Sequence, residues 1–170
     1  MMTTTMRNTK HLPRIACVLF VGCVLPLPYE VNPDGPSNSP PVIRSSNPAM
    51  PGPVTFSASA PQIFSIEVED LDVTDTLYVR VFRNYQLGAP TPPVYRSQKG
   101  NDPQTGTVLR SLTLPTHTFC AGENTPGLTL YFQILIADRD FLDDAQSPAF
   151  LALPDDAQST SGYWFGTCTP

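Results

Sequence analysis

Hydrophobic and polar residues alternate along two neighbouring stretches near the middle of the chain. Between Ile63 and Glu69, apolar side chains at every second position are separated by serine and glutamate, and the same period returns between Thr76 and Arg83. Because successive side chains of a strand point to opposite faces of a sheet, this period predicts strands with one buried face. The residues between the two stretches are rich in aspartate, a poor strand former that favours turns. We therefore predict two β-strands joined by an acidic loop.

The remaining apolar runs are also short and are separated by residues that favour turns. The most apolar run, Leu128–Ile136, has hydrophobic residues at every second position and predicts a central strand. In Thr107–Leu114 the expected inward positions, starting at Val108, are apolar except for Arg110, which does not fit the pattern. Further strands are expected near Val42-Ile43, Val54–Phe56 and Val94-Tyr95, and at Gly162–Cys168. Seven or eight such strands predict an all-β, antiparallel sandwich, with a small barrel as the alternative.

The composition agrees with a chain of strands and loops. Of the 170 residues, 20 are proline, which neither donates to a strand ladder nor fits inside a helix. Hydrophobic residues make up 41% of the chain, which is enough for the core of one domain. The formal net charge is −5, and an acidic surface repels a phosphate backbone. We therefore expect one domain that does not bind nucleic acid.

The chain begins with a basic segment followed by an apolar one. Basic residues from Arg7 to Arg14 precede an apolar run that is too short to cross a bilayer, a pattern typical of a secretory signal. Within it, Phe20-Val21-Gly22-Cys23 resembles the lipobox of bacterial lipoproteins, whose cysteine is lipidated after cleavage. The resemblance implies a lipid anchor on Cys23 and, with Val24 next to it, an outer-membrane lipoprotein. The alternative is an ordinary signal peptide that is cleaved nearby.

A proline-rich segment follows this cysteine. Its composition is that of an extended linker that cannot bury a core. A fully extended segment of this kind would reach up to about 55 Å, at about 3.1 Å per residue. The sequence thus divides into a signal peptide (1–22), a proline-rich tether (23–41) and a folded domain (42–170).

Acidic turns follow two of the predicted strands. Glu69-Asp70-Leu71-Asp72-Val73-Thr74-Asp75 ends the first strand of the central pair, and Ile136-Ala137-Asp138-Arg139-Asp140 ends the most apolar strand. In both places the chain is similar to bacterial immunoglobulin-like domains of the cadherin, PKD and fibronectin type. The similarity implies an immunoglobulin-like β-sandwich of seven to eight strands. The cysteine pair and strand tryptophan of antibody domains are absent, which excludes an antibody-type domain.

The same resemblance implies that the two acidic loops lie at one end of the sandwich. Ca²⁺ prefers oxygen ligands from flexible loops, and cadherin-like modules use similar acidic ends. The candidate calcium ligands are Asp70, Asp72, Asp75, Asp138 and Asp140, with Glu69, Asp143 and Asp144 nearby. The alternative is that these are solvated turn residues, one of them paired with Arg139.

Two cysteines remain besides the signal segment and the lipidation site. Leftover cysteines in an oxidising compartment usually pair, so we expect a disulfide between Cys120 and Cys168. This bridge would hold the last strand to the rest of the domain. In the alternative, Cys120 is a nucleophile activated by His117, three residues away.

The sequence DDAQS occurs twice, at 143–147 and at 155–159. The two copies bracket an apolar segment and indicate a long, lid-like connection, with a helical turn after Asp143 as one expectation. Five residues are too few to define a repeat architecture, so chance or local duplication accounts for the echo equally well.

No nucleophile elbow, P-loop or dinucleotide fingerprint occurs, and His117 is the only histidine beyond the signal segment. We therefore predict a non-catalytic binding or structural module of the cell envelope, with calcium as the one candidate cofactor. Its expected partner is an unknown envelope protein or glycan. In the aromatic run Tyr163-Trp164-Phe165, one face of the last strand is expected to join the core, and the other face either contacts such a partner or is ordinary half-exposed packing. The alternatives are a calcium-stabilised adhesion or assembly domain, and a secreted hydrolase that uses loop carboxylates such as Asp70 and Asp138.

Overall fold

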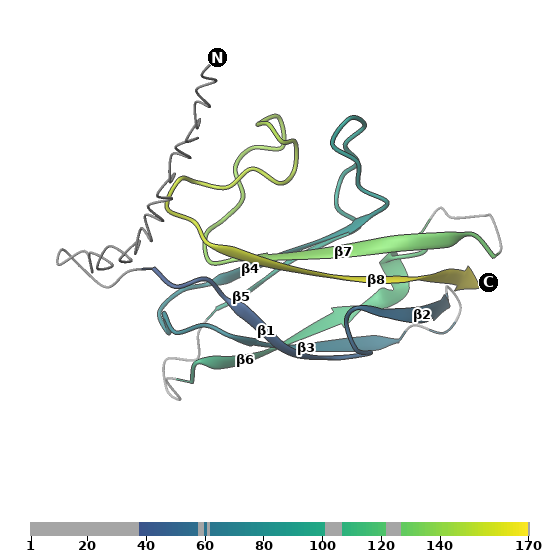
Figure 1. Cartoon of the computed structure of the whole chain (residues 1–170), viewed down its shortest axis with the longest axis horizontal. Helices are drawn as coiled ribbons and strands as arrows, with labels where there is room; N and C mark the ends of the chain where they lie inside the picture. The colour runs from purple at the N-terminus through teal and green to yellow at the C-terminus, as the bar shows by residue number, and fades with distance from the viewer. Residues whose placement is uncertain (1–37, 58–59, 61, 101–106, 122–126, 170) are drawn as a thin grey trace, which may run out of the picture. The chain divides into compact units, whose positions relative to one another are not determined.

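The computed structural model of this chain contains two β-sheets, which are formed by eight strands in total (Figure 1). The structure describes residues 38–57, 60, 62–100, 107–121 and 127–169, all within one unit that spans Pro36–Pro170. The predicted signal peptide, Cys23 and most of the predicted tether lie outside the described residues. The described part of the chain contains no helix with the length and apolar character needed to cross a membrane.

The sheets have three and five strands. The first has the order β1-β3-β6, with β1 at Val42–Asn47, β3 at Ile63–Glu69 and β6 at Leu109–Pro115. The second has the order β2-β8-β7-β4-β5, with β2 at Gly52–Ser57, β8 at Ser159–Thr169, β7 at Thr129–Ala137, β4 at Leu77–Arg83 and β5 at Tyr95–Lys99. A single 3-10 turn, η1 at Thr116–Thr118, is the only helical element in these ranges. The domain is an immunoglobulin-like β-sandwich with eight strands, as predicted, and not a closed barrel.

One strand pair departs from the antiparallel pattern. Strand β1 is antiparallel to β3, whereas β2 lies in the other sheet and runs parallel to β8. Only four residues separate β1 from β2, so the chain changes sheet while it keeps its direction. Gly166 allows the close approach of β2, because a Cβ atom at that position would lie 1.9 Å from the carbonyl oxygen of Val54.

The inward faces of the strands form the core, largely at the positions that the alternation predicted. The buried side chains include Phe64, Ile66 and Val68 of β3, Leu77, Val79 and Val81 of β4, and Leu130, Phe132, Ile134 and Ile136 of β7. The predicted core positions of Leu128 and Val108 are wrong, since Leu128 is 45% exposed and Val108 is 37% exposed. Each precedes the strand that it was expected to begin, so neither is held against the opposite sheet.

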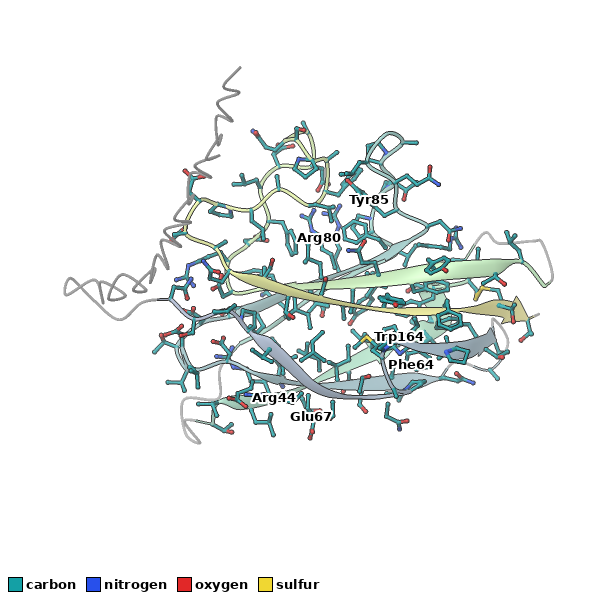
Figure 2. All side chains as sticks on the ribbon, viewed as in Figure 1. Arg44, Phe64, Glu67, Arg80, Tyr85 and Trp164 are labelled. Atoms are coloured by element: carbon teal, nitrogen blue, oxygen red, sulfur yellow. A yellow bond between two sulfur atoms is a disulfide. The ribbon has the colours of Figure 1, made fainter. Side chains whose placement is uncertain are left out.

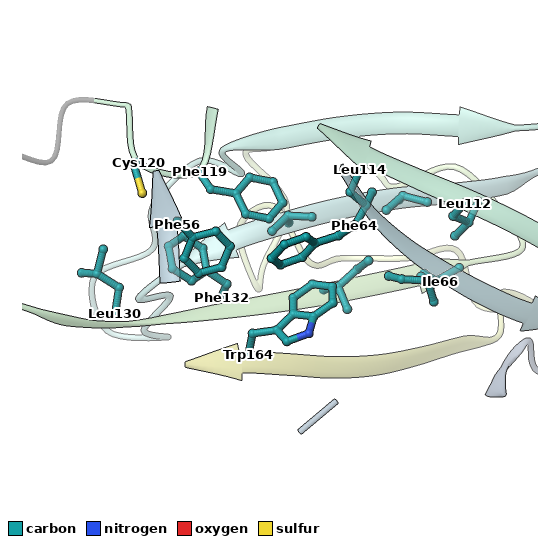
Figure 3. Packing of buried hydrophobic residues seen from close by; sticks show 14 of the residues in the cluster. Phe56, Phe64, Ile66, Leu112, Leu114, Phe119, Cys120, Leu130, Phe132 and Trp164 are labelled. Atoms are coloured by element: carbon teal, nitrogen blue, oxygen red, sulfur yellow. The ribbon is translucent and has the colours of Figure 1, made fainter. Parts of the chain in front are cut away.

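Aromatic side chains fill the end of the core at which β8 finishes (Figure 3). The ring centroids of Phe56 and Phe132 are 4.4 Å apart, and Trp164 lies 5.1 Å from Phe64 in an edge-on arrangement. The indole nitrogen of Trp164 donates to the carbonyl oxygen of Pro48 at 3.1 Å. Trp164 therefore connects β8, β3 and the segment between β1 and β2.

Cys120 and Cys168 form the predicted disulfide, with their Cα atoms 5.8 Å apart. The bridge joins the segment after η1 to the penultimate residue of β8. Because Cys120 is bonded, the alternative in which it acts as a nucleophile beside His117 is wrong.

Candidate functional site

The two acidic loops meet at one end of the sandwich, as predicted. Arg139, which follows β7, donates to the Asp75 carboxylate in the loop between β3 and β4 at 2.7 Å. It also lies 3.8 Å from the carboxylate of Asp156. The predicted alternative of an Arg139 ion pair is therefore confirmed for Asp75.

The candidate ligands of the β3–β4 loop bind groups of the protein itself. Asp70 is fully buried, where one carboxylate oxygen accepts from the Asp72 amide at 3.0 Å and the other lies 3.4 Å from the Arg110 guanidinium. The carboxylate of Asp72 accepts from the backbone amide of Ser39 at 2.6 Å. These contacts order the loop from within the domain.

The candidate ligands after β7 are engaged in the same way. Asp138 is buried and accepts from the side-chain amide of Asn38 at 2.7 Å and from the backbone amide of Gln158 at 2.9 Å. Asp140 accepts from the amide of Phe141 at 2.8 Å. Asn38 belongs to the segment that the sequence assigned to the tether, and here it contacts the domain.

The acidic end is thus built from pairs of an acid and its donor. Within the described residues, no group of three or more His, Cys, Asp or Glu side chains is placed to hold a metal ion. Calcium binding by Asp70, Asp72, Asp75, Asp138 and Asp140 stays a prediction. In this geometry Asp70 and Asp138, the carboxylates considered for a hydrolase, are buried and hold loop backbone.

The long connection between β7 and β8 is held against the outer face of the five-stranded sheet. Arg80 of β4 donates to the Asp144 carboxylate at 3.0 Å and to the carbonyl oxygen of Phe150 at 2.6 Å, and its guanidinium lies 4.2 Å from the centre of the Phe141 ring. Burial lowers the pKa of Arg80. Figure 2 shows Arg80 and Tyr85 above this sheet, under the connections β7–β8 and β4–β5.

Two further contacts complete this attachment. Arg96 of β5 donates to the other oxygen of Asp144 at 2.8 Å, and the Tyr85 hydroxyl donates to the carbonyl oxygen of Ala149 at 2.6 Å. The hydrogen bond from Arg96 holds the pKa of Asp144 below its usual value, and Arg80 adds to this effect. A cavity of about 540 Å³ lies between the connection, β4 and β5, and both of its arginines pair with Asp144.

The two DDAQS segments have different roles. In the first, the amide of Gln146 donates to the carbonyl oxygen of Asp143 at 2.8 Å, which closes a turn and not a helix. The second leads from the turn at Ala157 into β8 at Ser159. The echo therefore does not mark a structural repeat.

A second cavity, of about 410 Å³, lies on the outer face of the five-stranded sheet, beside the connection between β4 and β5. We call it the aromatic groove. Its lining comes from the residues after β4 (Asn84, Tyr85, Gln86), from β7 (Tyr131, Gln133) and from β8 (Ser161, Gly162, Tyr163). None of these residues is charged, and three of them are tyrosines.

Strand alternation places the aromatic residues of the groove. Trp164 is fully buried while Tyr163 is 46% exposed, so the predicted division of the last strand into a core face and an outer face is confirmed. Tyr131 of β7 is 58% exposed and lies opposite Phe165 of β8, with their ring centroids 6.3 Å apart. Gln133 lies opposite Tyr163 in the same register.

Tyr131, Tyr85 and Asn84 were not predicted from the sequence as candidate site residues. The alternation within Leu128–Ile136 placed Tyr131 outward, and that was the available signal. Asn84 has a positive φ of 50°, a conformation that asparagine tolerates better than most residues. Its side-chain oxygen accepts from the Tyr131 amide at 2.8 Å, which ties the β4–β5 connection to β7.

Comparison with known proteins gives no family assignment. The sequence matches no family model and no curated protein. A PapD-like (ASH) domain of human CEP192 is similar in structure, with 11% identity and a TM-score of 0.38 over 97% of this chain and 98% of that domain. AggA, the major subunit of aggregative adherence fimbriae type I from Escherichia coli, has 12% identity and a TM-score of 0.31 over 78% of this chain and 97% of that subunit. At these TM-scores neither similarity carries an argument about function.

Proposed function

We propose that this chain is a non-catalytic binding module of the cell envelope and that the aromatic groove is its ligand-binding surface. The observation that supports this is the exposure of Tyr131 and Tyr163 beside a cavity of about 410 Å³. Large exposed aromatic side chains next to a concave surface with a few polar groups are typical of ligand sites. The carboxylates that could serve an enzyme instead bind arginines and backbone amides of the same domain.

The proposal includes a lipid anchor at Cys23, through which the binding domain is held at the outer membrane by a proline-rich tether. It is supported by the resemblance of Phe20-Val21-Gly22-Cys23 to a lipobox. The test is the intact mass of the protein extracted from membranes, which should show acyl groups on Cys23. Replacement of this residue, Cys23→Ser, should release the protein from the membrane fraction, and an unmodified wild-type N-terminus would contradict the anchor.

The binding surface is tested by photo-crosslinking in intact cells. A photoreactive amino acid at position 163 lies at the groove, and the same group at position 113 lies on an exposed site of β6 in the other sheet. We expect adducts from position 163 and none from position 113. Adducts from neither position, or equally from both, would contradict a ligand site in the groove. Because the reagent captures protein and glycan alike, this test does not depend on the ligand class.

A further inference from the structure

We propose that the aromatic groove binds a neutral glycan through the rings of Tyr131 and Tyr163. This inference rests on the proposed function, in which the groove is the binding surface, and it adds the chemical class of the ligand. Three properties of the groove carry it: its exposed aromatic rings, its side-chain amides and hydroxyl groups, and its lack of charge.

The aromatic rings suit the faces of a sugar. Tyr131 and Tyr163 stand on adjacent strands, β7 and β8, and they are 58% and 46% exposed. A pyranose ring presents a face of C–H groups that packs flat on an aromatic ring, and the negative face of the ring attracts those weakly positive hydrogens. Neither tyrosine belongs to the core cluster of the domain, and although Tyr131 pairs with Phe165 across the two strands, both tyrosines stay largely open to solvent.

The polar groups of the groove suit the edges of a sugar. Gln133 lies on the neighbouring strand opposite Tyr163, and Ser161 and Gln86 line the same cavity. A side-chain amide offers donors and an acceptor side by side, and a hydroxyl group offers both functions. Two neighbouring hydroxyl groups of a sugar also offer donors and acceptors side by side, so they can pair with such side chains. Asn84 uses its oxygen to hold the Tyr131 amide, which leaves its amide nitrogen to donate.

The absence of charge defines the class of glycan. No Asp, Glu, Lys or Arg lines the groove, so an anionic sugar or a phosphate would lose its hydration there without a counter-ion. The whole chain has a formal charge of −5, which disfavours anions further. Three tyrosines could also surround a quaternary ammonium, but the groove has no carboxylate to favour a cation over a neutral ligand.

The size of the groove suits a short glycan. A cavity of about 410 Å³ falls within the range of roughly 300–1,000 Å³ that is usual for small-ligand sites, so one or two sugar residues fit.

One wall of the groove depends on the connection between β7 and β8. The Tyr85 ring lines the cavity, and its hydroxyl donates to the carbonyl oxygen of Ala149 at 2.6 Å. The ring also packs edge-on against Phe82, with centroids 5.1 Å apart. Tyr85 is therefore a positioning residue, and Tyr85→Phe should weaken glycan binding less than loss of Tyr131 or Tyr163 does.

The test uses the full mature chain in detergent and affinity electrophoresis through gels that contain one polysaccharide each. The neutral probes are β-glucan, mannan, galactan and soluble chitin oligomers, and the charged probes are alginate and choline-substituted polymer. We expect retardation by at least one neutral probe, at least a tenfold loss of affinity in Tyr131→Ala and Tyr163→Ala, and near wild-type affinity in Tyr163→Phe. Thr113→Ala, on the other sheet, is the matched control and should bind as the wild type does.

Several results would overturn the inference. These are retardation only by the charged probes, no retardation by any neutral probe, or wild-type affinity in both alanine variants. Because both tyrosines are exposed, their variants should fold, and circular dichroism with thermal melting verifies this. If the neutral probes fail while position 163 still gives adducts with a protein in cells, the glycan is wrong and the binding module stands. If position 163 gives no adduct either, both proposals fail.

Discussion

Asp70 and Arg110 face each other inside the sandwich, with the carboxylate 3.4 Å from the guanidinium and side-chain exposures of 0% and 3%. Arg110 also donates to the backbone oxygens of Asp72 and Asp75. Burial raises the pKa of Asp70, and the Asp72 amide and the Arg110 charge oppose that shift. The residue that broke the apolar pattern of β6 is therefore the group that holds the acidic loop in place.

Arg110→Met should destabilise the domain strongly. Removing one partner of a buried ion pair leaves an uncompensated charge and typically costs about 3–5 kcal/mol. Urea unfolding followed by Trp164 fluorescence would measure the change in the free energy of unfolding. Arg44→Met is the matched control, because Arg44 pairs with Glu69 at the surface, and it should change stability little. The double variant Asp70→Asn with Arg110→Met should recover part of the loss. Equal stability of Arg110→Met and the control Arg44→Met would contradict the role of Arg110.

The attachment of the β7–β8 connection should weaken in acid. Arg96 and Arg80 lower the pKa of Asp144 from its usual 3.8, so its contribution to stability is present above that value and is lost as the pH falls through the lowered pKa. Asp144→Asn lacks this contribution at every pH. We expect the melting temperature of the wild type to exceed that of Asp144→Asn at about pH 7, the difference to shrink once the pH falls below about 3.8, and the two to converge below the lowered pKa.

The second DDAQS segment provides the control for this experiment. Asp155 is exposed, and Asp155→Asn should follow the wild type over the whole pH range. A constant difference between the wild type and Asp144→Asn, down to the lowest pH, would mean that the charge of Asp144 is not what holds the connection.

The disulfide should stabilise the domain through the length of chain that it closes. Cys120 and Cys168 are separated by 48 residues, for which the chain-entropy model gives about 4 kcal/mol. The double variant Cys120→Ser with Cys168→Ser should therefore unfold at lower urea concentration. Reductant should destabilise the wild type and leave the double variant unchanged. If reductant changes neither protein, the bridge does not contribute to stability.

The strands could be predicted from the sequence because their periodicity records which face is buried. Ile63–Glu69 was correct to the residue, and the two cysteines left one plausible pairing. The parallel pair of β2 and β8 could not be predicted, since the change of sheet depends on the whole topology and not on local pattern. The candidate site could not be predicted from local pattern either. Tyr131 and Asn84 are 47 residues apart in sequence, and only the register of β4 and β7 brings them together.

The contacts at the acidic end favour the alternative to calcium binding, in which the turn aspartates are held within the domain, so we expect calcium to leave the melting temperature of the wild type unchanged. The acids that the sequence brought together are held by donors of the same chain: Asp75 by Arg139, Asp138 by Asn38 and the Gln158 amide, and Asp72 by the Ser39 amide. A calcium ion needs six to eight oxygens, so it would have to displace several of these contacts to bind. Thermal melting in millimolar Ca²⁺ and in chelator would measure the effect. A melting temperature that rises in Ca²⁺ for the wild type, but not for Asp75→Asn or Asp138→Asn, would show that the acidic end is a metal site, because each variant removes one carboxylate ligand.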